Sequence, residues 1–368
     1  MSTGDAKTPG SGEGLRVQEF FHTCLKDNRG PFLVSLILGG IALLTTLILT
    51  WQHVSRLRQR PICMLQSYYT SIFVFPTVWA ISAFSTLICP RSAPLAELAQ
   101  GQSEAWAIYV FLVILFVLVA RESLADEVRH ASEEQHLETK ARGTGAAIVT
   151  ALARQGPQPF FAVPPFFCCF VRCFPKHDLS ARHLLRVSAL VRQYAYLQLF
   201  FSVFSLWAEF TVPEDRAKQW ASFSRTVLKI SGFMAIYGLF VMYKATHDLL
   251  HEWKTTGKFI AIKVVILLSI LQEKVIKMLI YKFRRKDNTC LVDPADPEDL
   301  DHVVTYWSQF ALLLDTILMV CLLSRAFDPE EVQDLQQQHL DLVELELQQM
   351  KVEGGNLKTE SDSDDDSD

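Results

Sequence analysis

Long blocks of apolar residues dominate the chain and alternate with short polar connections. An α-helix of roughly 20 apolar residues crosses the ~30 Å hydrocarbon core of a bilayer. The hydrophobic pattern therefore predicts an all-α membrane protein, a bundle of seven transmembrane helices. The predicted spans are residues 31–53, 66–88, 104–120, 187–208, 225–243, 259–281 and 303–323.

The polar ends of the 368-residue chain divide it into four parts. Residues 1–30 are predicted to be a disordered tail with no apolar core of a cleaved signal peptide, so the first span serves as the signal. Residues 31–327 form the transmembrane domain. Residues 328–352 predict a cytoplasmic helix, and residues 353–368 an acidic disordered tail. Within that tail we expect phosphorylation sites at Ser361, Ser363 and Ser367.

Basic residues set the predicted orientation. Arg56, Arg58 and Arg60 follow the first span directly, and the long connection 121–186 is also basic, which marks both as cytoplasmic. Alternation of the spans then places the N-terminus outside and the C-terminus in the cytoplasm. The basic segment 282–286 disagrees, because this scheme places it outside.

Charged residues interrupt the sixth predicted span, FIAIKVVILLSILQEKVIKMLIY. Wherever this helix sits, some of them must lie at membrane depth, where a charge costs from about 2.5 kcal/mol upward. At about 100° per residue, Lys263, Lys274 and Lys277 share one stripe. Glu273 lies on its flank and Gln272 on the opposite side. The stripe predicts the lining of a substrate path; alternatively, Lys263 snorkels to the interface and Glu273 pairs with Lys277.

Two further residues interrupt apolar spans. Asp315 lies near the middle of the last span, where lipid cannot solvate a carboxylate, so we expect it to be neutral, paired or facing water. Lys263 enters from the same side in the predicted orientation. We predict that the two approach each other, as a structural ion pair or as part of the substrate path. Pro76 removes a backbone hydrogen bond in the second span and predicts a kink that permits rearrangement.

Three cysteines cluster in the apolar segment FFCCFVRCF, beside a predicted cytoplasmic face. They are Cys168, Cys169 and Cys173. The apolar setting favours reversible S-palmitoylation at the membrane interface. The alternatives are plain hydrophobic contact, or a zinc site for which His177 is the nearby candidate as fourth ligand.

Sequence motifs of enzymes are missing from the chain. It has no phosphate-binding glycine loop, kinase signature, dinucleotide fingerprint or nucleophile elbow. His247 and His251 share a helical face but lack the glutamate of the zinc-protease pattern, so an ordinary interfacial helix is favoured. The seventh span also lacks the Asn-Pro-x-x-Tyr pattern of rhodopsin-like receptors. We expect no enzyme, no cofactor, no metal and no nucleic-acid partner.

Several stretches together resemble the organic solute transporter alpha and transmembrane protein 184 family. The most specific is KFIAIKVVILLSILQ, which is similar to the family's Lys-Phe-x-x-x-Lys…Gln signature. It places Lys258, Phe259, Lys263 and Gln272 at matching positions. Further resemblance lies in residues 75–76, 104–109, 238–250 and 306–327, the last with Asp315 where an acidic residue is usual, and in the cysteine cluster of the transporter branch. The chain departs from the 184-type relatives at Ala120-Arg121-Glu122, where those have Gly-Gly-Glu.

The resemblance implies facilitated, bidirectional movement of amphipathic organic anions such as steroid conjugates or bile acids. It also implies a small single-span partner subunit, with a homo-oligomer as the other assembly we consider. The protein would lie among the lipids of the plasma membrane or an endomembrane. The alternative function is a non-transporting membrane protein in vesicle trafficking or signalling, which would act through the long loop and the tail.

Overall fold

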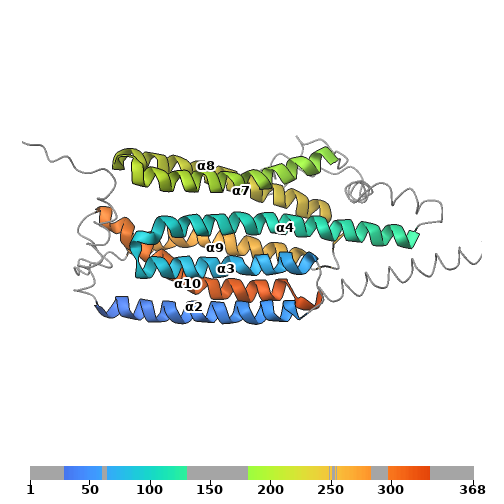
Figure 1. Cartoon of the computed structure of the whole chain (residues 1–368), viewed down its shortest axis with the longest axis horizontal. Coiled ribbons are helices and arrows are strands. Elements are labelled where there is room, and N and C mark those ends of the chain that lie inside the picture. Colours follow the sequence, from blue (N-terminus) through green and yellow to red (C-terminus); the bar gives the residue numbers. More distant parts are fainter. Residues whose placement is uncertain are drawn as a thin grey trace, which may run out of the picture.

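The fold is a bundle of long α-helices (Figure 1). The computed structural model describes residues 29–59, 64–130, 181–247, 249–250, 253, 255–282 and 297–331. Within these ranges the structure contains helices and turns but no strand. The elements are α2 (Arg29–Arg58), α3 (Met64–Ile88), the short 3-10 helix η1 (Pro90–Ser92), α4 (Ala93–His130), α7 (Ala181–Thr211), α8 (Glu214–Thr246), α9 (Thr255–Lys282) and α10 (Pro297–Ala326).

Each of the long helices in the described part of the chain could cross a bilayer by length. The shortest, α3, has 25 residues, or about 37 Å at 1.5 Å per residue. Five helical segments are both long and apolar enough: Gly30–Arg58, Leu65–Ile88, Pro90–Glu122, Gln219–Thr246 and His302–Glu331. The other two long helices, α7 and α9, are established as possible spans by their length alone. The described residues thus form a helical fold with five candidate membrane spans, while the count of seven spans and the orientation stay predictions.

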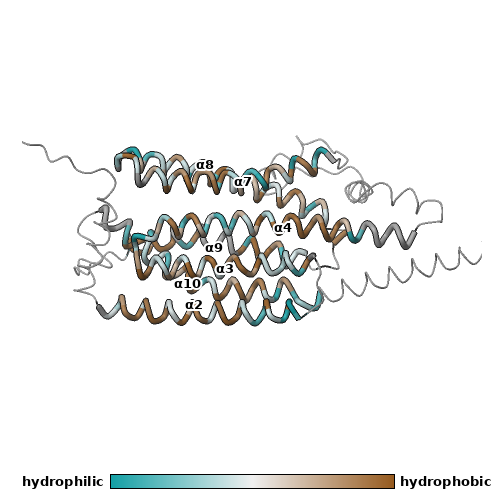
Figure 2. Tube along the Cα trace, in the orientation of Figure 1, coloured by the Kyte–Doolittle hydropathy of each residue, from teal (hydrophilic) through white to brown (hydrophobic). Residues whose placement is uncertain are grey.

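The helices extend beyond the predicted spans. α4 begins at Ala93 and ends at His130, whereas the hydrophobic pattern predicted only residues 104–120. A hydropathy pattern marks the part of a helix that lies in the hydrocarbon, but backbone hydrogen bonding continues into the interfacial region. Figure 2 shows this on α2, which is apolar along most of its length and polar toward Arg58.

The helices fall into two groups. α3 packs against α2, α4 and α10, and α9 packs on α10. α7 and α8 pack against each other as a hairpin, which adjoins the rest of the bundle mainly through α4. In Figure 1 the hairpin lies along the top edge and α2 along the bottom edge. The outward side of α2 exposes Leu33, Ile37, Leu44 and Trp51, as expected of a surface that faces lipid.

α10 holds together the first group of helices (α2, α3, α4, α9 and α10) through buried polar contacts. Because water is absent from the bilayer core, such groups need partners within the protein. The contacts are Ser35–Tyr306, Thr46–Thr316 at 3.0 Å, Gln100–Gln309 at 2.9 Å and Gln272 to the Ser308 carbonyl at 3.0 Å. The contact residues rise together along both helices, so α2 and α10 run parallel. α10 is thus tied to α2, α4 and α9.

Pro76 is buried, and α3 continues as one helix on both sides of it. Several predictions fall outside the described residues. These are the tail 1–28, the loop 131–180 with Cys168, Cys169, Cys173 and His177, the histidine His251, the basic residues 283–286, residues 332–352, and the acidic tail with Ser361, Ser363 and Ser367.

Candidate functional site

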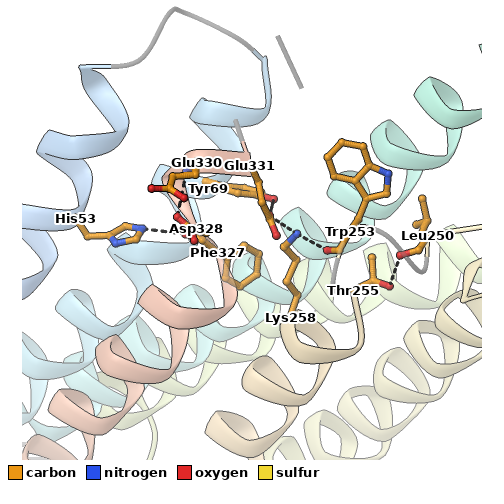
Figure 3. Close-up of polar contacts among 10 residues, drawn as sticks. All are labelled: His53, Tyr69, Leu250, Trp253, Thr255, Lys258, Phe327, Asp328, Glu330 and Glu331. Carbon is orange, nitrogen blue, oxygen red and sulfur yellow. Dashed lines mark hydrogen bonds and ion pairs between the residues drawn. The ribbon is translucent and has the colours of Figure 1, made fainter. Parts of the chain in front are cut away.

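A buried ion pair lies at the end of the bundle where α2 and α10 end and α3 and α9 begin, which we call the Arg58 end. Lys258, near the start of α9, is fully buried. Its ammonium group lies 2.5 Å from Oε2 of Glu331 and donates a hydrogen bond of 2.8 Å to the carbonyl of Trp253 (Figure 3). A charge can remain in such a place only when charged and polar partners replace its water.

Tyr69 of α3 supplies a second donor to the same carboxylate oxygen. Its hydroxyl donates to Oε2 of Glu331 at 3.1 Å, and its ring centre lies 5.7 Å from the Lys258 ammonium. Figure 3 shows the two side chains converging on Glu331 from different helices. The Glu331 side chain is 12% exposed, so this carboxylate closes the site from the outer side.

The residue that follows α10 anchors this arrangement. Phe327 is fully buried, with its ring centre 5.1 Å from that of Tyr69 and 6.5 Å from that of Phe111. Nε2 of His53 donates to the Phe327 carbonyl at 3.1 Å, and the His53 ring stacks on Phe73. The end of α10 is therefore fixed against α2, α3 and α4.

Large side chains bridge α8 and α9 next to this end, at a contact that we call the α8–α9 seam. It consists of Phe240 and Tyr243 of α8 with Phe259 and Lys263 of α9. The Phe259 ring stacks on Tyr243 at 4.5 Å and meets Phe240 edge-on at 4.8 Å. Lys263 is exposed, and its ammonium lies 4.3 Å from the centre of the Phe240 ring. A cation and an apolar surface thus lie side by side at the seam.

The other predicted path residues of α9 divide between two sides of the helix. Lys274 and Lys277 are exposed, as Lys263 is. Gln272 is half-buried on the opposite side, where it donates to the Ser308 carbonyl of α10. The side chain of Glu273 lies outside the described residues. The exposed face of α9 therefore carries the lysines, and the face toward α10 carries the amide.

The structure does not bring Lys263 and Asp315 into an ion pair among the described side chains. Asp315 is half-buried and lies two turns beyond Ser308, on the same stripe of α10. Lys263 lies on the side of α9 opposite Gln272, and Gln272 is the residue that contacts α10.

Among the polar contacts that were not predicted from the sequence are two that each involve a glutamate. One is the Lys258–Glu331 pair, although Lys258 directly precedes the predicted sixth span. The other joins α4 to α7, where the Tyr194 hydroxyl donates to Oε1 of Glu104 at 3.4 Å. Glu104 is the first residue of the predicted third span, so hydropathy placed it at the membrane surface. A charged residue at the edge of an apolar block was the available signal in both cases.

The side chains at the Arg58 end and at the α8–α9 seam are suited to binding charged and amphipathic groups. The described residues contain no group of three or more His, Cys, Asp or Glu side chains that could hold a metal ion. The lysine at the seam offers a cation beside aromatic rings, which suits an anionic group attached to an apolar body.

Comparison with known proteins identifies the family of the chain. Residues 33–332 match the model of the family described as organic solute transporter Ostalpha, which covers most of the 368 residues. No solved structure matches the chain. The matched region contains every described transmembrane helix almost completely, together with the Arg58 end through Glu331. The protein is therefore an integral membrane protein that belongs to the organic solute transporter Ostalpha family.

Proposed function

We propose that this protein is a facilitative carrier that moves amphipathic organic anions, such as steroid conjugates or bile-acid-like molecules, across the membrane. Membership of a solute transporter family supports this function. The observation that carries it is the position of Lys263, an exposed cation on a membrane helix beside an aromatic ring. In the predicted topology Lys263 would lie at membrane depth, where a charge is by default a functional feature.

The chemistry of the seam fits both ends of such a substrate. The anionic end would pair with Lys263, since a charge-assisted contact is strong where water is scarce. The apolar body would lie along the exposed apolar residues Ile260, Val264 and Leu271 of the same helix. The chain has no nucleotide-binding motif, so the substrate gradient would drive movement.

The wider proposal keeps the predicted topology. It has seven spans, with the N-terminus outside and the Arg58 end in the cytoplasm.

Lys274 and Glu273 would continue the path along α9, and Pro76 would allow α3 to rearrange. Gln272 and Asp315 would supply polar groups between α9 and α10. A single-span partner subunit or a second copy would accompany the chain, and palmitoylation of Cys168, Cys169 and Cys173 would hold the long loop at the membrane.

Uptake of a radiolabelled steroid sulfate into proteoliposomes tests this function. We expect Lys263→Ala to lower uptake about tenfold or more, because a hydrogen-bonded charge contributes about 1.5–3 kcal/mol. The matched control is Lys282→Ala, since Lys282 is also exposed on α9 but lies in its last turn. Absence of uptake by the wild-type protein, with or without a co-expressed partner subunit, would instead favour a role in vesicle trafficking or signalling.

A further inference from the structure

We propose that Lys258 and Tyr69 form a second anion-binding site at the Arg58 end, which the chain's own Glu331 occupies in this conformation. The anionic end of the transported molecule would exchange with the Glu331 carboxylate as it enters or leaves the protein at this end. We call Lys258 and Tyr69 together the exchange site. The inference rests on the proposed carrier function for its substrate, but the site itself is defined by the geometry of the bundle.

The donors of the exchange site are held in place independently of Glu331. The Lys258 ammonium is anchored by the Trp253 carbonyl at 2.8 Å, and Tyr69 is fully buried with its ring against Phe327. Both then donate to one oxygen of Glu331, at 2.5 and 3.1 Å. Two donors from separate helices that converge on one acceptor oxygen form a site for a carboxylate, and a sulfate offers the same kind of oxygen.

The segment that carries Glu331 is able to leave without unwinding α10. Regular helix ends at Ala326, and a new helical turn begins after Asp328, whose Oδ1 accepts a hydrogen bond from the Glu330 backbone N–H at 3.1 Å. This break would allow Glu331 to move while α10 and Phe327 stay in place. Because Lys258 is fully buried and the Glu331 side chain is partly accessible, an incoming anion would meet Glu331 first.

The exchange site lies closer to the Arg58 end than the seam does. Lys258 is five residues before Lys263 on α9, which is about 7.5 Å closer to the Arg58 end. Phe259 lies between them and packs against Phe240 and Tyr243 of the seam. The two lysines lie about 140° apart around α9, so an anion that passes from Lys263 to Lys258 would have to move around the helix past Phe259.

Binding of a radiolabelled steroid sulfate to the purified full-length protein tests the exchange. Glu331→Gln removes the charge of the carboxylate that occupies the site, so the fraction of protein with an available site rises and the apparent Kd falls, by about three- to tenfold. The measurement is made in a Lys263→Ala background, so that binding at the seam does not mask the result. The matched control is Glu330→Gln, which makes the same change at an exposed neighbour and should leave the Kd unaltered. An unchanged or higher Kd for Glu331→Gln would overturn the proposal.

A second measurement on the wild-type protein avoids any effect of substitution on folding. Saturating steroid sulfate should speed amide hydrogen exchange in residues 329–331, because their carboxylate anchor is displaced. Slower or unchanged exchange would mean that Glu331 is only a structural clamp. Failure of the carrier function looks different: the wild-type protein then transports nothing, whatever Glu331→Gln does to binding.

Discussion

The ammonium group of Lys263 lies over the ring of Phe240, 4.3 Å from its centre, and joins α9 to the α7–α8 hairpin. A cation over an aromatic face contributes about 0.5–1 kcal/mol at an exposed site. The contact therefore orients the lysine without burying it. This leaves Lys263 able to bind an anion from the exposed side of the seam.

Replacement of Phe240 tests how much this orientation matters. We expect Phe240→Leu to lower steroid sulfate uptake about two- to fivefold, because the leucine keeps the apolar packing but loses the attraction for the ammonium group. Phe240→Tyr retains an aromatic face and serves as the control. Equal uptake by the leucine and tyrosine variants would show that the ring does not position Lys263.

Two adjacent glycines of α2 should respond differently to a side chain. A Cβ at Gly39 would lie 3.1 Å from Leu313 and 3.3 Å from Leu87, whereas a Cβ at Gly40 would meet nothing closer than 3.9 Å. We expect Gly39→Val to destabilise the protein by about 1–3 kcal/mol through overpacking. Gly40→Val, the control, should lower stability by less. Thermal unfolding in detergent measures both; similar melting temperatures would contradict close packing of α2 on α10.

The amide pair between α4 and α10 should behave as one unit. Gln100 donates to Gln309 at 2.9 Å, and Gln309 is buried. Truncating either residue to alanine leaves the other amide without this partner, which costs about 1–3 kcal/mol. The double variant should lose clearly less stability than the sum of the two single variants. Strict additivity of the three free energies of unfolding would argue that the two amides do not interact.

The proposed orientation can be checked at Cys89, which is exposed between α3 and η1. We expect a variant that keeps Cys89 as its sole cysteine to react with a membrane-impermeant maleimide added outside intact cells. This follows because the basic residues Arg56 and Arg58, at the opposite end of the bundle, mark the cytoplasmic side. Labelling only after permeabilisation would reverse the orientation, in agreement with the basic segment 282–286.

The sequence was sufficient for the class of fold but not for the way the helices face one another. Apolar blocks identified each long helix, and the 100° repeat placed Lys263 and Gln272 on opposite sides of α9, as the structure has them. Within the part of the chain that the structure describes, there is no ion pair between Lys263 and Asp315. Predicting whether the two side chains meet requires knowing how α9 is rotated relative to α10. A single helix does not contain that information.

The ion pair at the Arg58 end was missed for a related reason. Lys258 lies just before one predicted span, and Glu331 lies in the segment 328–352 that was predicted to be a cytoplasmic helix, so the hydrophobic pattern did not pair them. Only the packing of four helix ends brings them together and buries the lysine completely. Whether a residue at the border of an apolar block is buried or exposed depends on the tertiary structure, because the hydropathy pattern does not place it on either side of the border.

The parallel pairing of α2 with α10 has a consequence for biosynthesis. The Thr46 and Thr316 hydroxyls that bond across this pair are 270 residues apart in sequence, so α2 enters the membrane long before its partner has been translated. Until then its polar residues must be sheltered by α3, by a chaperone or by the insertion machinery. Release of a finished protein therefore waits for the last helix, and premature stop codons ahead of it should yield chains that quality control removes.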